Sequence, residues 1–130
     1  MEPERVDEKK EEITMQYLLL IYENEQIGAK MSKAEGDKFM QEYFAFTNAI
    51  KDSKNYLSGE ALQPVSTATT VRVRDGKTVT TDGPFAETRE QLGGFYMIEA
   101  KDLDEARSIA ARIPSSRHGS IEVRPVVKFG

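Results

Sequence analysis

The 130-residue sequence predicts an α+β fold, in which an antiparallel sheet carries two helices on one face and an inserted β-hairpin. Two observations support this fold class. Apolar periodicities follow one another as strand, helix, strand in both halves of the chain. Between these units, Asp75-Gly76 separates two alternating segments, and this dipeptide is a strong two-residue hairpin signal. The length indicates one domain.

The first expected strand, residues 15–22 (MQYLLLIY), is apolar on both of its alternating faces. Such a strand is normally covered on both faces. Helices on one face of the sheet leave the other face bare, and a second subunit is the simplest cover. The sequence therefore predicts a homodimer packed sheet against sheet. The alternative is that the inserted hairpin folds back over this face within one chain.

Two helices are expected from their start signals and their spacing. Ser32 and Glu35 form a capping-box pattern, and apolar residues then recur at helical intervals to about Ser53. Asp102 and Glu105 repeat this kind of start before a second apolar stripe, which Pro114 ends.

The remaining strands are short. Residues 55–62 form a strand interrupted by Gly59, residues 69–74 and 77–81 form the hairpin, and residues 94–100 form the next strand. The Gly93-Gly94 pair indicates a β-bulge at the entry to that strand. Residues 121–129 form the last strand, where Pro125 favours an edge position or a bulge. This order of elements is typical of a ferredoxin-like fold.

Composition narrows the classes of function. The absence of cysteine excludes disulfides, thiolate catalysis and cysteine-rich metal sites. Residues 2–12 carry six acids and three bases, so we expect residues 1–14 to be a disordered charged tail before a domain at 15–130. The near-neutral remainder argues against a nucleic-acid partner. No secretory signal or membrane span is visible, which predicts a cytoplasmic protein without a membrane partner.

Asp82 is the first candidate catalytic residue. A turn aspartate usually accepts a hydrogen bond from the amide two residues on, but that residue is Pro84, which has no N–H. A bracing bond to the amides of Phe85 or Ala86 remains the alternative. His118, the single histidine, is the second candidate, because imidazole suits proton transfer near neutral pH. Its alternative is a surface or structural role.

Three further residues are candidates for ligand binding. The guanidinium of Arg124 suits an anionic group if its face of the last strand lines a cleft, and Glu87 and Tyr22 are weaker candidates. All three are otherwise solvent-facing or structural residues. One histidine without cysteine, and no spaced acidic loop, give no basis for a metal site, and we expect no cofactor.

Two segments of the chain resemble the YCII-related family, in the branch named for its DGPF motif: DGPFAETREQLGGF and RHGSIEVRPV. The likeness covers the chain from about Met15 onward. The resemblance implies a dimeric ferredoxin-like α/β barrel. It also implies a His–Asp pair in a cleft. Asp82 falls in the family's motif and His118 in the C-terminal RHG segment, but the pair of distant members comes partly from other positions, and this chain has no histidine in its first helix. Some members of other branches look like small dehydrochlorinases or lyases that act on ring compounds.

Two functions follow as hypotheses. The first is a small-molecule-binding protein or a small lyase-type enzyme with an Asp/His acid–base site. The second is a regulatory protein that contacts an extracytoplasmic-function sigma factor, since genes of the DGPF branch often lie beside such a factor. The sequence leaves open whether the protein is an enzyme.

Overall fold

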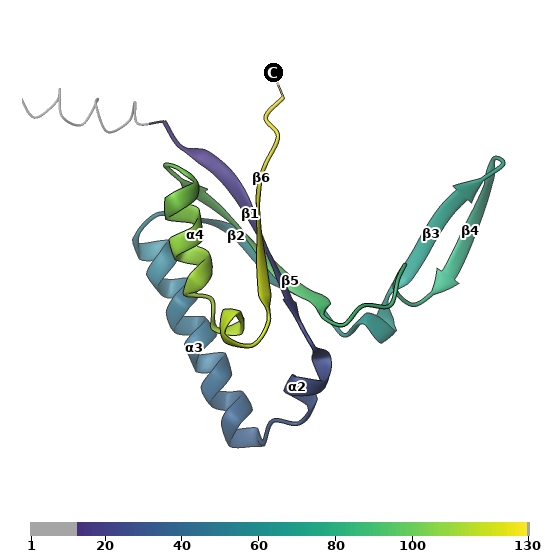
Figure 1. Cartoon of the computed structure of the whole chain (residues 1–130), viewed down its shortest axis with the longest axis horizontal. Coiled ribbons are helices and arrows are strands. Elements are labelled where there is room, and N and C mark those ends of the chain that lie inside the picture. Colours follow the sequence, from purple (N-terminus) through teal and green to yellow (C-terminus); the bar gives the residue numbers. More distant parts are fainter. Residues whose placement is uncertain (1–12, 130) are drawn as a thin grey trace, which may run out of the picture.

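The computed structural model describes residues 13–129, and its centre is a four-stranded sheet in the order β2-β5-β1-β6. These strands are Tyr56–Ala61, Gln91–Ala100, Met15–Glu23 and Ser120–Pro125. Every neighbouring pair is antiparallel. A separate two-stranded sheet pairs β3 (Thr69–Arg74) with β4 (Lys77–Asp82). This mixed α+β architecture is consistent with the ferredoxin-like expectation (Figure 1).

Two long helices, α3 (Lys33–Asp52) and α4 (Leu103–Ala111), pack on the same face of the sheet. Both predicted starts are confirmed. Ser32 and Glu35 form a reciprocal capping box, and the Asp102 carboxylate accepts a hydrogen bond from the amide of Glu105. A short helix, α2 (Glu25–Ala29), was not predicted. It buries no residue, so it leaves no apolar stripe in the sequence.

The core lies between the sheet and the helices. From β1 it takes Tyr17, Leu19 and Ile21, while Phe46 and Ile50 of α3 close over them. The side chains that alternate with these point to the other side of the sheet. There Leu18 is opposite Met97 and Leu20 is opposite Phe95, and all four are only partly buried. We call this apolar group, Leu18, Leu20, Phe95 and Met97, the open face.

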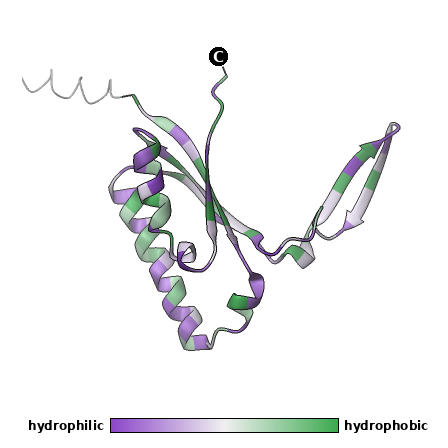
Figure 2. Cartoon of the chain, viewed as in Figure 1, coloured by the Kyte–Doolittle hydropathy of each residue, from purple (hydrophilic) through white to green (hydrophobic). Residues whose placement is uncertain are grey.

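The hairpin does not fold back over the open face. Figure 1 shows β3 and β4 extending away from the four-stranded sheet. Figure 2 shows hydrophobic bands along both of its strands, although they lie apart from the core. The expected sheet-against-sheet partner stays a prediction, because the structure describes a single chain.

Two strand boundaries differ from expectation. The last strand ends at Pro125 instead of residue 129. Its pairing with β1 ends with Tyr17 opposite Pro125, and one further bond follows, from the amide of Val126 to the carbonyl of Gln16. β5 begins at Gln91 and includes the glycine pair. Its register against β1 shifts between Ile21 and Tyr22, which leaves Gly93 unpaired and confirms the bulge.

The expected tail, residues 1–14, lies almost wholly outside the described residues, so that prediction stays open. Within residues 13–129, no helix has the length and apolar character needed to cross a membrane.

Candidate functional site

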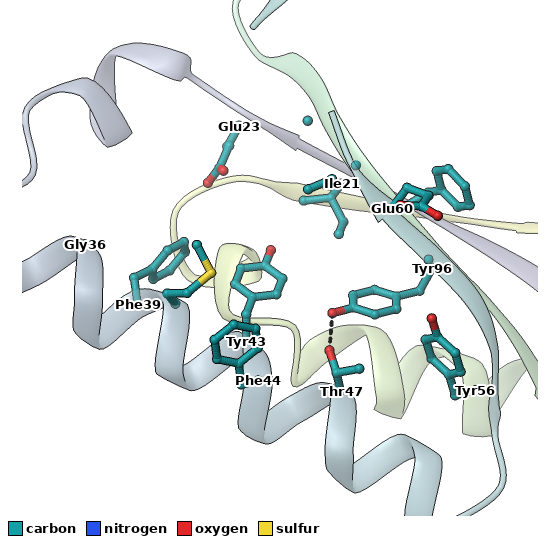
Figure 3. Close-up of a pocket in the computed structure, with 16 residues that line it drawn as sticks. Ile21, Glu23, Gly36, Phe39, Tyr43, Phe44, Thr47, Tyr56, Glu60 and Tyr96 are labelled. Atoms are coloured by element: carbon teal, nitrogen blue, oxygen red, sulfur yellow. Dashed lines mark hydrogen bonds between the residues drawn. The ribbon is translucent and has the colours of Figure 1, made fainter. Parts of the chain in front are cut away.

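A cavity of about 380 Å³ lies between α3 and the helix-facing side of the sheet. Its walls are mostly aromatic and aliphatic, with hydroxyls and the glutamates Glu23 and Glu60 among them (Figure 3). The side chains that define it come from β1 (Ile21, Glu23), α3 (Phe39, Met40, Tyr43, Phe44, Thr47), β2 (Tyr56) and β5 (Tyr96).

The helical repeat explains how α3 supplies one wall. Phe39, Tyr43 and Thr47 are spaced four residues apart, which places them in a row along one side of the helix. Phe39 and Tyr43 pack edge to face, with ring centroids 5.4 Å apart. Gly36 continues this row one turn earlier and leaves the end of the cavity without a side chain.

The opposite wall depends on a glycine in β2. Gly59 is paired with Tyr96 of β5, and the aromatic ring of Tyr96 lies directly over the glycine. A Cβ atom on residue 59 would be 2.8 Å from Cδ1 of Tyr96, closer than real contacts allow. The Gly59 that interrupts the expected strand therefore makes room for a cavity-lining ring.

Two hydroxyl pairs fix the aromatic walls. The hydroxyls of Thr47 and Tyr96 are 2.5 Å apart, and those of Tyr43 and the fully buried Ser115 are also 2.5 Å apart. Burial raises the pKa of Tyr43 to about 12, with a smaller contribution from the nearby Glu23 carboxylate. Burial likewise raises the pKa of Tyr96. Both phenols are therefore neutral at physiological pH and serve as hydrogen-bonding groups.

A carboxylate and an imidazole meet at one end of the cavity. Nε2 of His118 is 2.8 Å from Oε2 of Glu23, and both side chains are about three-quarters buried, with 25% and 29% of their surface exposed. The imidazole also packs against the ring of Phe39, 5.5 Å between centroids. Glu23 lines the cavity. His118 does not line the cavity, but its imidazole forms a hydrogen bond with the Glu23 carboxylate.

The close approach of the chain at Gly119 makes this pair. A Cβ atom at residue 119 would be 2.2 Å from the carbonyl oxygen of Tyr22, so only glycine lets the segment after His118 run so close to the end of β1. The turn Pro114–Arg117 leads into this contact. Residues separated by 95 positions in sequence are thus neighbours.

A second, wider groove of about 940 Å³ lies where the hairpin joins the domain. It brings together two of the predicted ligand-binding residues, Tyr22 and Glu87, with Pro84 and Phe85 of the DGPF loop. Several of its polar side chains form hydrogen bonds with the protein's own backbone. The side chains of Glu25 and Gln91 accept hydrogen bonds from the amides of Val65 and Glu25. The hydroxyls of three threonines donate to backbone carbonyls: Thr67, Thr70 and Thr88.

The two predicted catalytic residues lie in different places. Asp82 is exposed at the end of β4, paired across the hairpin with Thr69, and lines neither cavity. His118 has Glu23 as its carboxylate partner. Gly83, next to Asp82, has a φ of 103°, which only glycine adopts readily and which accounts for this part of the motif.

Arg124 lies on the open-face side of β6, opposite Leu18 in register, and lines neither cavity. Its guanidinium binds the neighbouring carboxylate of Glu122, which raises the pKa of Arg124.

Sequence reasoning missed Glu23, the one carboxylate whose partner is the histidine. A polar residue at the end of an apolar strand was its only signal, and nothing in the spacing linked it to residue 118. The helical spacing of the α3 aromatic residues is most simply that of a core stripe, yet only Phe46 is buried in the core and Tyr43 packs against it. Phe39, Tyr43 and Phe44 line the cavity, and Phe44 is 62% exposed.

Among residues 13–129, no three histidine, aspartate or glutamate side chains lie close enough together to hold a metal ion. The cavity can enclose an apolar ring and offer it hydroxyls and the carboxylate of Glu23.

These features define a small α+β protein with a pocket between a helix and an antiparallel sheet. The model of the YCII-related domain matches residues 15–130. A relative from Rhizobium meliloti (strain 1021), uncharacterized protein R00369, is 36% identical over 117 residues, which cover 88% of this chain and 94% of the relative. The chain belongs to the YCII-related family.

Proposed function

We propose that this protein binds a small ring compound in the cavity between α3 and the sheet. The observation that supports this proposal is an apolar, aromatic-walled cavity of about 380 Å³ with the Glu23 carboxylate at one end. The other glutamate that lines it, Glu60 of β2, is exposed to solvent. Ligand pockets in proteins typically have volumes of roughly 300–1,000 Å³ and few polar groups among apolar walls. This cavity fits the small end of that range.

The polar groups define the ligand further. A carboxylate at the end of a largely apolar cavity repels an anionic ligand and accepts hydrogen bonds from a hydroxyl or amine. A ring with a hydroxyl or amino group therefore suits this cavity better than a ring acid. Arg124, the group expected to bind an anion, lies elsewhere.

If the bound ring undergoes a lyase-type reaction, Glu23 is the group placed to take a proton from it, with His118 as the residue that positions the carboxylate. This assigns acid–base work to a Glu/His pair. Asp82 enters such a site only if another copy brings it there, since it lines neither cavity of its own chain.

We further propose that the protein is a homodimer packed through the open face. Leu18, Leu20, Phe95 and Met97 form a contiguous apolar patch at the centre of that side of the sheet, and such patches mark interaction surfaces. Ferredoxin-like topology and the dimeric α/β barrel are part of this proposal. The sigma-factor contact stays a prediction, because no particular surface favours it.

Occupancy of the cavity can be tested with a variant that fills it. Gly36 is helical, lines the cavity and has nothing within 4 Å of the place where a Cβ would lie. Gly36→Leu should therefore fold normally and block the cavity, while Gly36→Ala serves as the matched control. Binding is measured by calorimetry and by ligand-detected NMR with phenol, benzylamine and benzoate.

We expect phenol or benzylamine to bind the control protein more tightly than benzoate, and Gly36→Leu to weaken this binding by at least about tenfold, which corresponds to ~1.4 kcal/mol. Glu23→Gln should remove the preference against benzoate. Equal binding by the leucine and alanine variants, or no binding of any ring up to millimolar concentration, would contradict the proposal.

A further inference from the structure

The hairpin formed by β3 and β4, residues 69–82, is a second feature that requires explanation. We call it the arm. Its strands pair only with each other, and Figure 1 shows that it projects away from the domain. A two-stranded hairpin by itself is at best marginally stable in water.

The register gives the arm two different faces. One face carries Val71 and Val73, which are opposite Thr80 and Thr78. The other face carries Arg72, Arg74 and Lys77 together with Val79. Alternation of valine with arginine is typical of strands with one covered and one solvated face. Yet Val71 and Val73 are 59% and 61% exposed.

The groove at the base of the arm is similarly uncovered. Phe85, in the loop that follows β4, lines this groove and is 77% exposed. The groove also includes Tyr22 and Leu92. Tyr22 follows Leu18 and Leu20 on the same side of β1, so the groove continues the open face at one end.

The basic side chains of the arm lie away from its valine face. Arg72, Arg74 and Lys77 are all on the opposite face, whereas the two acids of the arm are Asp75 at the turn and Asp82 at the base. The Val71/Val73 face can therefore lie against apolar surface of a second copy while the basic side chains stay in solvent.

We propose that the arm of each protomer packs its Val71/Val73 face against a second copy of this chain, so that the partner closes the groove lined by Tyr22, Phe85 and Glu87. The groove is then a composite site that is complete only in the dimer. This inference rests on the proposed homodimer. The open face places the second copy beside the groove, and a partner there covers the valines that the arm's own domain leaves bare.

Nucleic acid is the competing occupant for a basic hairpin. The net charge of −4 for the whole chain disfavours it, because binding to phosphates depends on positive charge.

The chain contains no tryptophan, so Phe85→Trp introduces a single reporter into the groove. The reporter protein is diluted from high to low micromolar concentration while its emission and its sedimentation are followed. We expect emission at shorter wavelength in the dimer and the emission of an exposed indole in the monomer. Exposed-indole emission from a protein that sediments as a dimer would overturn the proposal.

The double variant Val71→Asp/Val73→Asp tests the arm itself. These side chains are largely exposed in the protomer, so far-UV circular dichroism should be unchanged, while the dimer dissociation constant should rise by at least about tenfold. Thr81→Asp, on the opposite face of the arm, is the matched control and should change the constant less than threefold.

The variant Leu20→Lys distinguishes a failure of the arm proposal from a failure of the homodimer proposal. If Leu20→Lys gives monomers and the double valine variant leaves the dissociation constant unchanged, the homodimer stands and the arm proposal is overturned. A wild-type protein that is monomeric at every concentration overturns both. A third outcome is that duplex DNA binds at physiological salt and the double variant Arg72→Ala/Arg74→Ala abolishes this binding. That outcome would overturn the arm proposal in favour of nucleic acid.

Discussion

Replacing Gly59 by alanine tests how the cavity wall is built. The added Cβ would be 2.8 Å from Cδ1 of Tyr96 and 3.0 Å from the carbonyl oxygen of Phe95. The backbone oxygen is fixed by the pairing of β2 with β5, so the aromatic ring has to move. Moving the ring separates the Tyr96 hydroxyl from Thr47, which is 2.5 Å away in the native protein.

The expected loss of stability can be estimated from these contacts. Overpacking of this kind costs about 1–3 kcal/mol. Loss of the hydrogen bond to Thr47 adds roughly 1 kcal/mol, and weaker edge-to-face packing on Phe46, now 5.2 Å between centroids, adds ~0.5 kcal/mol or more. Replacing a strand glycine by alanine regains about 0.5–1 kcal/mol. The net destabilisation is about 1.5–4 kcal/mol.

Urea unfolding followed by far-UV circular dichroism measures this change. With an m-value of about 2 kcal/mol/M, the midpoint should fall by about 0.75–2 M. Gly93→Ala is the matched control, because Gly93 lines the same cavity and its Cβ would meet nothing within 4 Å. If Gly59→Ala is as stable as the wild type, or if Gly93→Ala loses as much, the argument from the Tyr96 ring is refuted.

Two other substitutions have defined outcomes. Tyr43 has a pKa of about 12 in the folded protein against 10.0 for a free tyrosine, so the folded state holds this proton more tightly. Its contribution to stability is complete below pH 10 and is lost as pH rises through 12. Tyr43→Phe should lower the free energy of unfolding at pH 7, because it leaves the buried Ser115 hydroxyl without a partner. In urea titrations above pH 10, the free energy of unfolding should decline less steeply for this variant than for the wild type. Parallel declines for both proteins would contradict this. Gly119→Ala should destabilise by several kcal/mol, on the order of 3 or more, since its Cβ meets a backbone oxygen of Tyr22 at 2.2 Å. It should also separate His118 from Glu23, visible as a changed imidazole signal in NMR, and an unchanged signal with wild-type stability would show that the close approach is unnecessary.

Local signals explain most of the successful predictions about the fold. The Ser32 and Asp102 caps are hydrogen bonds between residues three apart, and the Asp75-Gly76 turn needs positive φ at both positions, 53° and 75°. Such features depend on neighbouring residues alone. The end of the last strand was misplaced because it depends on how far this strand pairs with β1, which lies near the other end of the sequence.

The candidate site was predicted less well, for the same reason. Asp82 and His118 were paired on residue type, but sheet order places His118 beside Glu23. The cavity exists because Gly59 lets Tyr96 lie over β2 while Phe39 and Tyr43 face it from α3. None of these contacts is visible in the spacing of residues along the chain.

The sequence by itself determined the two longer helices with their caps, the order of the strands, the hairpin turn, and an opening strand that is apolar on both sides. The tertiary structure alone decided which carboxylate meets the histidine, that the hairpin stands away from the sheet, and that a cavity remains under α3. The reason is physical: hydrogen bonds and side-chain periodicity within a few residues are set by local sequence, whereas contacts between distant residues exist only after the strands have taken their order and register.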